Sequence, residues 1–166
     1  KMGMADGLVS GACHSTGDVL RPALQILKTS PDAQMVSSFF IMNVPDCELG
    51  HNGTFLFSDC GLEVQPDAER LAQIALNAQN AWNSLIDDVD PVVAMLSHST
   101  YSSAKNDDSN KVIEATRIVK ELAPDMAVDG ELQLDAAIIP EIGSAKAPDS
   151  AVAGKANVLV FPDIDA

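Results

Sequence analysis

The chain alternates between short apolar runs and longer stretches in which apolar residues recur at helical spacing. Continuous apolar segments of about four to eight residues with β-branched or aromatic content are typical of buried strands. Such runs predict strands at Ser37–Val44, Thr54–Ser58, Pro91–Leu96 and Val158–Phe161, and shorter ones at Leu8–Ala12 and Met126–Val128. The connection Cys47–Gly53 holds Gly50 and Asn52-Gly53, which favours a hairpin turn between Ser37–Val44 and Thr54–Ser58.

The helical stretches have recognisable starts and stops. Apolar positions between Val19 and Leu27 predict a helix closed by Lys28 and Pro31, with Pro22 near its start, where a missing N–H is tolerated. Apolar spacings of three and four predict further helices over Pro66–Leu85, Asp107–Leu122 and Glu131–Ile139. Pro124 stops the second of these and the third ends near Pro140, and a long connection is expected over Gly143–Gly154.

Apolar strands that alternate with amphipathic helices are typical of a mostly parallel sheet. We therefore predict an α/β fold, with helices on both faces of such a sheet. The length of 166 residues is about one domain's worth. Strand-like sequence begins almost at Lys1 and a turn follows Phe161, so we expect the chain to be part of a longer polypeptide.

Charge narrows the range of partners. The chain has 24 Asp and Glu against 10 Lys and Arg, a formal net charge of −14. This excess opposes sequence-independent binding to nucleic acid or to an anionic membrane, so we expect neither partner. No apolar run approaches the ~20 residues of a membrane span. With no export signal at the N-terminus, the three cysteines are expected to be reduced thiols in a cytoplasmic protein.

The residues His14-Ser15-Thr16-Gly17-Asp18, followed by Arg21, form the first candidate site. Hydroxyls and free N–H groups at a helix start can bind an anion, and Arg21 would add a fork that matches phosphate or carboxylate. The alternative is that Ser15 or Thr16 only caps the helix and that Arg21 is a solvated surface residue.

A second candidate repeats this pattern in Ser97-His98-Ser99-Thr100, which continues to Lys105. Ligands of such sheets bind beyond the carboxyl ends of the strands, where this loop is expected. Simple turn and capping chemistry explains the same residues equally well.

Other chemistries have weaker support. Cys47, His51, Cys60 and the pair Cys13-His14 contain no CxxC and match no structural-zinc spacing, so we predict no metal site. Gly7-Leu8-Val9-Ser10-Gly11 lacks the spacing of a serine nucleophile elbow, and no phosphate-binding glycine motif precedes Lys155.

Several segments, taken in order, resemble the phosphate acetyltransferase (phosphotransacetylase) family. The resemblance covers essentially the whole chain. It rests on Ala5–Ala12, His14–Asp18, Leu20–Ala23, Ser37–Met42, Phe57–Gly61, Leu96–Thr100, Ser103–Lys105, Asp129–Ala137 and Lys155–Leu159.

The resemblance implies a cytoplasmic acyltransferase of acetate metabolism, usually a homodimer, with two α/β domains of the isocitrate/isopropylmalate dehydrogenase type. Its active site would lie between the domains, where the coenzyme A thiolate attacks acetyl phosphate directly to give acetyl-CoA and phosphate. Coenzyme A is then a substrate, with no permanently bound cofactor and no metal. Residues 1–32 would be the tail of the first domain and residues 33–166 most of the second.

The same resemblance assigns roles to residues. Arg21 matches a catalytic arginine that contacts the phosphoryl group, and Cys47 matches a cysteine near the site that is not a nucleophile. The remaining residues are expected to bind substrate: His14, Ser15, Thr16, Ser99, Thr100 and Lys105.

One departure limits the expected activity. The family's Ser-Arg-Gly-Cys-Ser segment and the aspartate after it, which supply a second arginine and the general base, have no match here. We therefore expect the 166-residue chain alone to be inactive or nearly so. Two alternatives remain open: the acetyl-CoA-sensing domain fused to some malic enzymes, and phosphate butyryltransferase, which the Asp129–Ala137 segment disfavours.

Overall fold

A computed structural model of the protein describes residues 3–5, 7–29 and 33–166. The chain divides into two compact units, Lys1–Val36 and Ser37–Ala166. The predicted domain boundary, after residue 32, and Pro31 both lie in a stretch outside the described residues. The assignment of residues 1–32 and 33–166 to two domains of the family stays a prediction.

The first unit contains helix α1 (Thr16–Ile26). Ser15 is its N-cap, because its side chain accepts a hydrogen bond from the backbone N–H of Asp18. The helix therefore begins earlier than predicted and Pro22 lies in its interior, where the proline ring leaves the carbonyl of Asp18 without its helical donor. The strand predicted at Leu8–Ala12 is wrong: these residues are irregular and mostly exposed, and the described part of this unit contains no strand with which they could pair.

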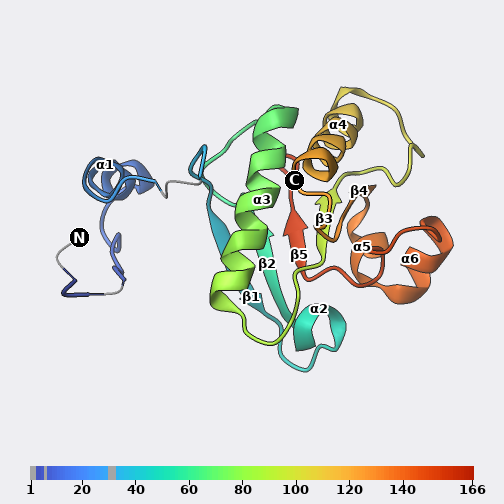
Figure 1. Ribbon diagram of the computed structural model, residues 1–166, viewed down its shortest axis with the longest axis horizontal. Coiled ribbons are helices and arrows are strands. Elements are labelled where there is room, and N and C mark those ends of the chain that lie inside the picture. Colours follow the sequence, from blue (N-terminus) through green and yellow to red (C-terminus); the bar gives the residue numbers. More distant parts are fainter. Residues whose placement is uncertain (1–2, 6, 30–32) are drawn as a thin grey trace. The chain divides into compact units, whose positions relative to one another are not determined.

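The second unit is built on a five-stranded sheet in the order β1-β2-β5-β3-β4 (Figure 1). β1 pairs antiparallel with β2, and the remaining neighbours are parallel, which confirms the mostly parallel sheet. The predicted hairpin between β1 and β2 is confirmed and contains the short helical segment α2 (Leu49–Asn52). The strands span β1 (Phe39–Asn43), β2 (Thr54–Ser58), β3 (Val93–Leu96), β4 (Val128–Leu132) and β5 (Val158–Val160).

Helices cover both faces of this sheet. Helices α3 (Ala68–Leu85) and α4 (Asp107–Leu122) pack against one another, and α3 also contacts β2 and β5 (Figure 1). α4 has the predicted extent, and α3 begins two residues later than predicted. Each begins at a side-chain cap, Asp67 for α3 and Asn106 for α4. Ala94 and Leu96 of β3 point to the other face, where they belong to a core cluster with Ala137 of α5 (Leu134–Ile138).

The secondary structure after Met126 differs from the predicted strand at Met126–Val128 and helix over Glu131–Ile139. Residues 128–132 form strand β4, so the helix expected over Glu131–Ile139 begins only at Leu134, as α5. Glu131 lies in β4, where its backbone carbonyl and its carboxylate both accept hydrogen bonds from the loop after β3. Pro140 opens helix α6 (Pro140–Lys146) as its first residue, where the missing N–H costs nothing, so part of the expected connection is helical.

Strand β1 forms one edge of the sheet and exposes a run of apolar side chains, Phe39, Phe40, Ile41 and Met42. Exposed apolar patches of this kind commonly mark contacts with other protein surfaces. By contrast, the single tryptophan of the sequence, Trp82 on α3, is fully buried. In the described part of the chain, no helix is long and apolar enough to cross a membrane.

Candidate active site

The helix start in the first unit has the predicted arrangement of hydroxyls. Ser15 Oγ donates to the carboxylate of Asp18 at 2.8 Å and accepts from the Asp18 N–H at 3.3 Å. Thr16 is the first residue of α1 and is exposed. Because backbone N–H groups in the first turn carry partial positive charge, this end of α1 favours an anion.

Arg21 lies one turn further along α1. Its side chain is 70% exposed and its guanidinium is 4.0 Å from the carboxylate of Asp18. Exposed ion pairs of this kind contribute about 0–1 kcal/mol to stability. Arg21 can therefore leave Asp18 and bind a ligand anion at little cost in free energy. His14 lines a largely apolar pocket of about 360 Å³ with Asp18, Val19 and neighbouring residues of α1.

In the second unit, polar side chains gather where the parallel strands end. Strands β2, β3, β4 and β5 have their carboxyl ends at the same edge of the sheet, since they are mutually parallel. The loops after these strands begin at Asp59, Ser97, Gln133 and Phe161. This is the edge at which ligands bind in open α/β sheets.

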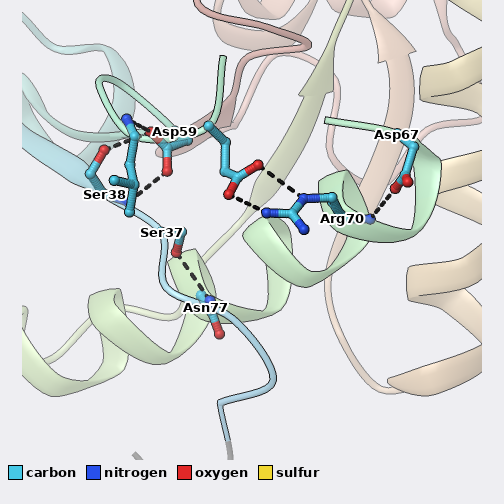
Figure 2. Close-up of polar contacts among 8 residues, drawn as sticks. Ser37, Ser38, Asp59, Asp67, Arg70 and Asn77 are labelled. Carbon is cyan, nitrogen blue, oxygen red and sulfur yellow. Dashed lines mark hydrogen bonds and ion pairs between the residues drawn. The ribbon is translucent and has the colours of Figure 1, made fainter. Parts of the chain in front are cut away.

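Asp59 organises the loop after β2. Its carboxylate accepts four hydrogen bonds, from the Ser38 N–H and hydroxyl at 2.7 and 2.6 Å and from the N–H groups of Gly61 and Leu62 at 2.9 and 2.8 Å. Figure 2 shows Ser38 and Asp59 facing one another. Burial alone would raise the pKa of Asp59, but these donors outweigh it and hold the pKa below its ordinary value. The side chain is therefore an anion held in place, and both of its oxygens already accept hydrogen bonds from the protein.

The thiol of Cys60 follows Asp59 and lines a pocket of about 190 Å³ with Phe40, Phe57 and Phe161. Burial raises the pKa of Cys60, and the negative charge of Asp59 adds to this effect. A thiol that stays protonated is a poor nucleophile, so the site offers no activated cysteine here.

The start of α3 places a cation near the end of the same loop. Arg70 donates through Nε to Glu63 at 3.0 Å and through a second nitrogen to the same carboxylate, while Asp67 caps its backbone (Figure 2). Two turns further along the same helix, Asn77 donates to the Ser37 hydroxyl at 3.0 Å. Arg70 is therefore held in a two-point ion pair.

Ser99 and Thr100, two of the predicted substrate-binding residues, are buried in the loop after β3. Ser99 Oγ donates to Glu131 at 2.8 Å, and Thr100 Oγ1 accepts from the Gln133 N–H at 2.9 Å. Their hydroxyls thus hold the loop against the end of β4. Lys105, in the same loop, is exposed.

A second network joins this loop to β4. The carboxylate of Asp129 accepts from Tyr101 Oη at 2.6 Å, Ser150 Oγ at 2.5 Å and Lys120 Nζ at 2.8 Å. Burial opposes ionisation of Asp129, yet these donors hold its pKa below the ordinary value. Burial of the hydroxyl, together with its hydrogen bond to Asp129, raises the pKa of Tyr101 to about 12.

The structure brings some of the predicted residues together and separates another. Ser99, Thr100 and Lys105 share one loop at the carboxyl edge of the sheet, and His14, Ser15, Thr16 and Arg21 share the start of α1. Cys47, in the β1–β2 connection, lies at the opposite, amino edge of the parallel strands. The functional roles of all these residues stay predictions.

Sequence reasoning gave no roles to Asp59, Glu131 and Asp129, although each fixes a loop at this site. The available clue was an acidic residue in or directly after an apolar strand, as in Phe57-Ser58-Asp59. Such a carboxylate must find donors when it is buried. Across the residues that the structure describes, no group of three or more His, Cys, Asp or Glu side chains is placed to hold a metal ion.

Comparisons with known proteins agree on one family. Residues 1–166 match the model of the Phosphate acetyl/butaryl transferase family. The chain is 58% identical over 166 residues to the phosphate acetyltransferase of Acetivibrio thermocellus and 47% identical over 164 residues to that of Bacillus subtilis. It spans about half the length of these curated relatives, 50% and 48% respectively.

A solved structure supports the same relationship. The crystal structure of a phosphotransacetylase from Streptococcus pyogenes matches with a TM-score of 0.85 at 50% identity, over 99% of this chain and 48% of that one. An extended match of this kind, in both sequence and fold, is far more specific than any single motif. The chain therefore belongs to the phosphate acetyl/butaryl transferase family.

Proposed function

We propose that the protein containing this chain is a phosphate acetyltransferase, which moves an acetyl group reversibly between phosphate and coenzyme A. The thiolate sulfur of coenzyme A attacks the carbonyl carbon of acetyl phosphate, the C–S bond forms, and the C–O bond to phosphate breaks to release inorganic phosphate. The single observation that carries this proposal is the whole-chain identity of 58% to a relative named phosphate acetyltransferase.

Arg21 is the residue proposed to hold the phosphoryl group. A guanidinium fork matches two phosphate oxygens, and the start of α1 adds N–H donors beside it. Its exposure and its weak pairing with Asp18 support this role, because little must be broken before an anion binds. His14, Ser15 and Thr16 are proposed as neighbouring contacts.

In the second unit, the loop containing Ser99, Thr100 and Lys105 is proposed to contact substrate at the carboxyl edge of the sheet. The burial of both hydroxyls favours backbone groups and Lys105 as the direct contacts. Cys47 lies at the amino end of β2, away from this loop, and we propose that it does not act as a nucleophile. Coenzyme A is a substrate in this account, and the chemistry uses no resident cofactor or metal.

We also propose that residues 1–32 and 33–166 belong to the first and second domains of an isocitrate/isopropylmalate dehydrogenase-like enzyme. The full-length protein is proposed to be a cytoplasmic homodimer, a state that analytical ultracentrifugation tests directly. Support for a reducing compartment comes from Cys13, Cys47 and Cys60, all of which are free thiols.

Formation of the thioester tests the proposed function. The full-length protein is mixed with coenzyme A and either acetyl phosphate or butyryl phosphate, and thioester absorbance is followed. We expect faster turnover of acetyl phosphate, and no turnover by the 166-residue chain alone, because the family segment that supplies the general base has no match in it. Preference for butyryl phosphate would assign the sister activity. Binding of acetyl-CoA without any turnover would assign a sensor domain instead.

A further inference from the structure

The loop after β3 contains a tight turn in an unfavourable backbone conformation. Tyr101 has φ of +46° and Ser102 has φ of +63°, so two consecutive non-glycine residues lie in the left-handed region. Each such residue is disfavoured for L-amino acids, and a pair persists only where surrounding contacts hold it.

Glu131 of β4 supplies it at several points. Its Oε1 accepts from the Ser102 N–H at 2.6 Å and from Ser99 Oγ at 2.8 Å. Its backbone carbonyl accepts from the Tyr101 N–H at 3.3 Å. Tyr101, Ser102 and Ser99 are therefore all hydrogen-bonded to Glu131.

The environment of this carboxylate indicates a positioning role. Glu131 is only 2% exposed, and none of the ion pairs found among the described residues includes it. Its hydrogen-bond donors are a hydroxyl and a backbone N–H of the loop itself. Burying a carboxylate without a cation is costly unless hydrogen bonds satisfy it, so the donors of this loop are what hold Glu131 in place.

The strand that carries Glu131 is held firmly against its neighbour. At Gly130, a Cβ atom would lie 2.6 Å from Met95 Cβ and 2.7 Å from the Met95 carbonyl oxygen, so only glycine allows β4 to approach β3 this closely. The contact also continues along the loop, because Ser99 Oγ accepts from the Ala104 N–H at 3.0 Å. Hydrogen bonds through Ser99 thereby connect β4 to Ala104, the residue that precedes Lys105.

We propose that Glu131 is a positioning residue that fixes the 99–104 turn, so that Lys105 and the loop N–H groups meet the phosphate-bearing substrate in one geometry. The inference rests on the proposed acetyl transfer for its functional consequence. The bracing of the turn stands on the hydrogen bonds alone.

The test uses the full-length protein with Glu131→Ala and Glu131→Gln, and Glu141→Ala at an exposed site on α6 as the matched control. Hydrogen exchange is measured for peptides that cover residues 99–105 and, separately, α3. Steady-state kcat and KM are measured for acetyl phosphate and coenzyme A. The melting temperature of each variant is recorded alongside.

For Glu131→Ala we expect about tenfold faster exchange in residues 99–105, since a lost hydrogen bond of this strength corresponds to about one decade. Exchange in α3 should stay unchanged, and kcat/KM should fall about tenfold. Glu131→Gln keeps an acceptor oxygen and should recover most of both effects, while Glu141→Ala should match the parent protein.

Unchanged exchange in residues 99–105 would overturn the proposal, as would equal loss in α3 or a failure of Glu131→Gln to restore either property. If Glu131→Ala does not fold, Ser99→Ala removes one donor and must show the same local increase in exchange. An inactive parent protein would refute the proposed acetyl transfer, whereas the exchange data would still decide whether Glu131 braces the turn.

Discussion

Replacing Asp59 by asparagine should destabilise the second unit measurably. The substitution preserves size, and its oxygen can keep the three bonds now made to one carboxylate oxygen, from the Ser38 hydroxyl and from Gly61 and Leu62. Its amide nitrogen then faces the Ser38 N–H, which now donates at 2.7 Å. One charge-assisted bond is lost and a buried donor is left unpaired, a loss of about 2–4 kcal/mol in free energy of unfolding.

Urea unfolding of the 166-residue chain, followed by the fluorescence of buried Trp82, measures this loss. Asp125→Asn, at an exposed carboxylate, is the matched control and should change stability by less than about 0.5 kcal/mol. Equal stability of Asp59→Asn and the parent chain would refute the idea that the four donors hold this loop.

The same comparison has a definite pH dependence. The pKa of Asp59 is lower in the folded chain than its ordinary value, so its ionised form stabilises the fold fully above about pH 4. That contribution is lost as pH falls through the folded pKa. The stability difference between the parent chain and Asp59→Asn should therefore shrink on acidification, and a constant difference would contradict the assigned charge.

Three further predictions address other parts of the chain. Arg21→Ala in the full-length protein should lower kcat/KM for acetyl phosphate about tenfold to a hundredfold with an unchanged melting temperature, and unaltered kinetics would reject its phosphate contact. Tyr101 is the single tyrosine of the sequence, and absorbance should show it ionising near pH 12 in the folded 166-residue chain and near pH 10 in urea. The stability that its hydroxyl contributes is therefore present below pH 10 and is lost as the pH rises through 12. Gly53→Ala should destabilise the β1–β2 hairpin by more than about 1 kcal/mol in urea unfolding, because φ is +82° and the new Cβ would lie 2.2 Å from a carbonyl oxygen, whereas Gly7→Ala, with open space around it, should not.

The elements that sequence predicted well are those whose determinants are local. Helices α3 and α4 carry their own caps, Asp67 and Asn106, and their apolar spacing continues to the last turn. The hairpin before β2 needs a residue with positive φ, and Gly53 provides it. In each case the information lies within a few neighbouring residues, so a single sequence is sufficient.

The features that sequence missed depend on partners far along the chain. Glu131 was expected in a helix, but the hydroxyl of Ser99, 32 residues away, places it in a strand. Asp59 had no predicted role because its main donor, Ser38, lies on the far side of the hairpin. Long-range hydrogen bonds of this kind leave no periodic pattern in a sequence.

Exchange of labelled inorganic phosphate into acetyl phosphate by the full-length protein tests the proposed function most directly. Direct attack by the coenzyme A thiolate needs both substrates at once, so we predict rapid exchange when coenzyme A is present and none when it is omitted. Absence of exchange in the presence of coenzyme A would contradict the proposed acetyl transfer. Exchange without coenzyme A would instead indicate a covalent acetyl-enzyme and would contradict direct thiolate attack.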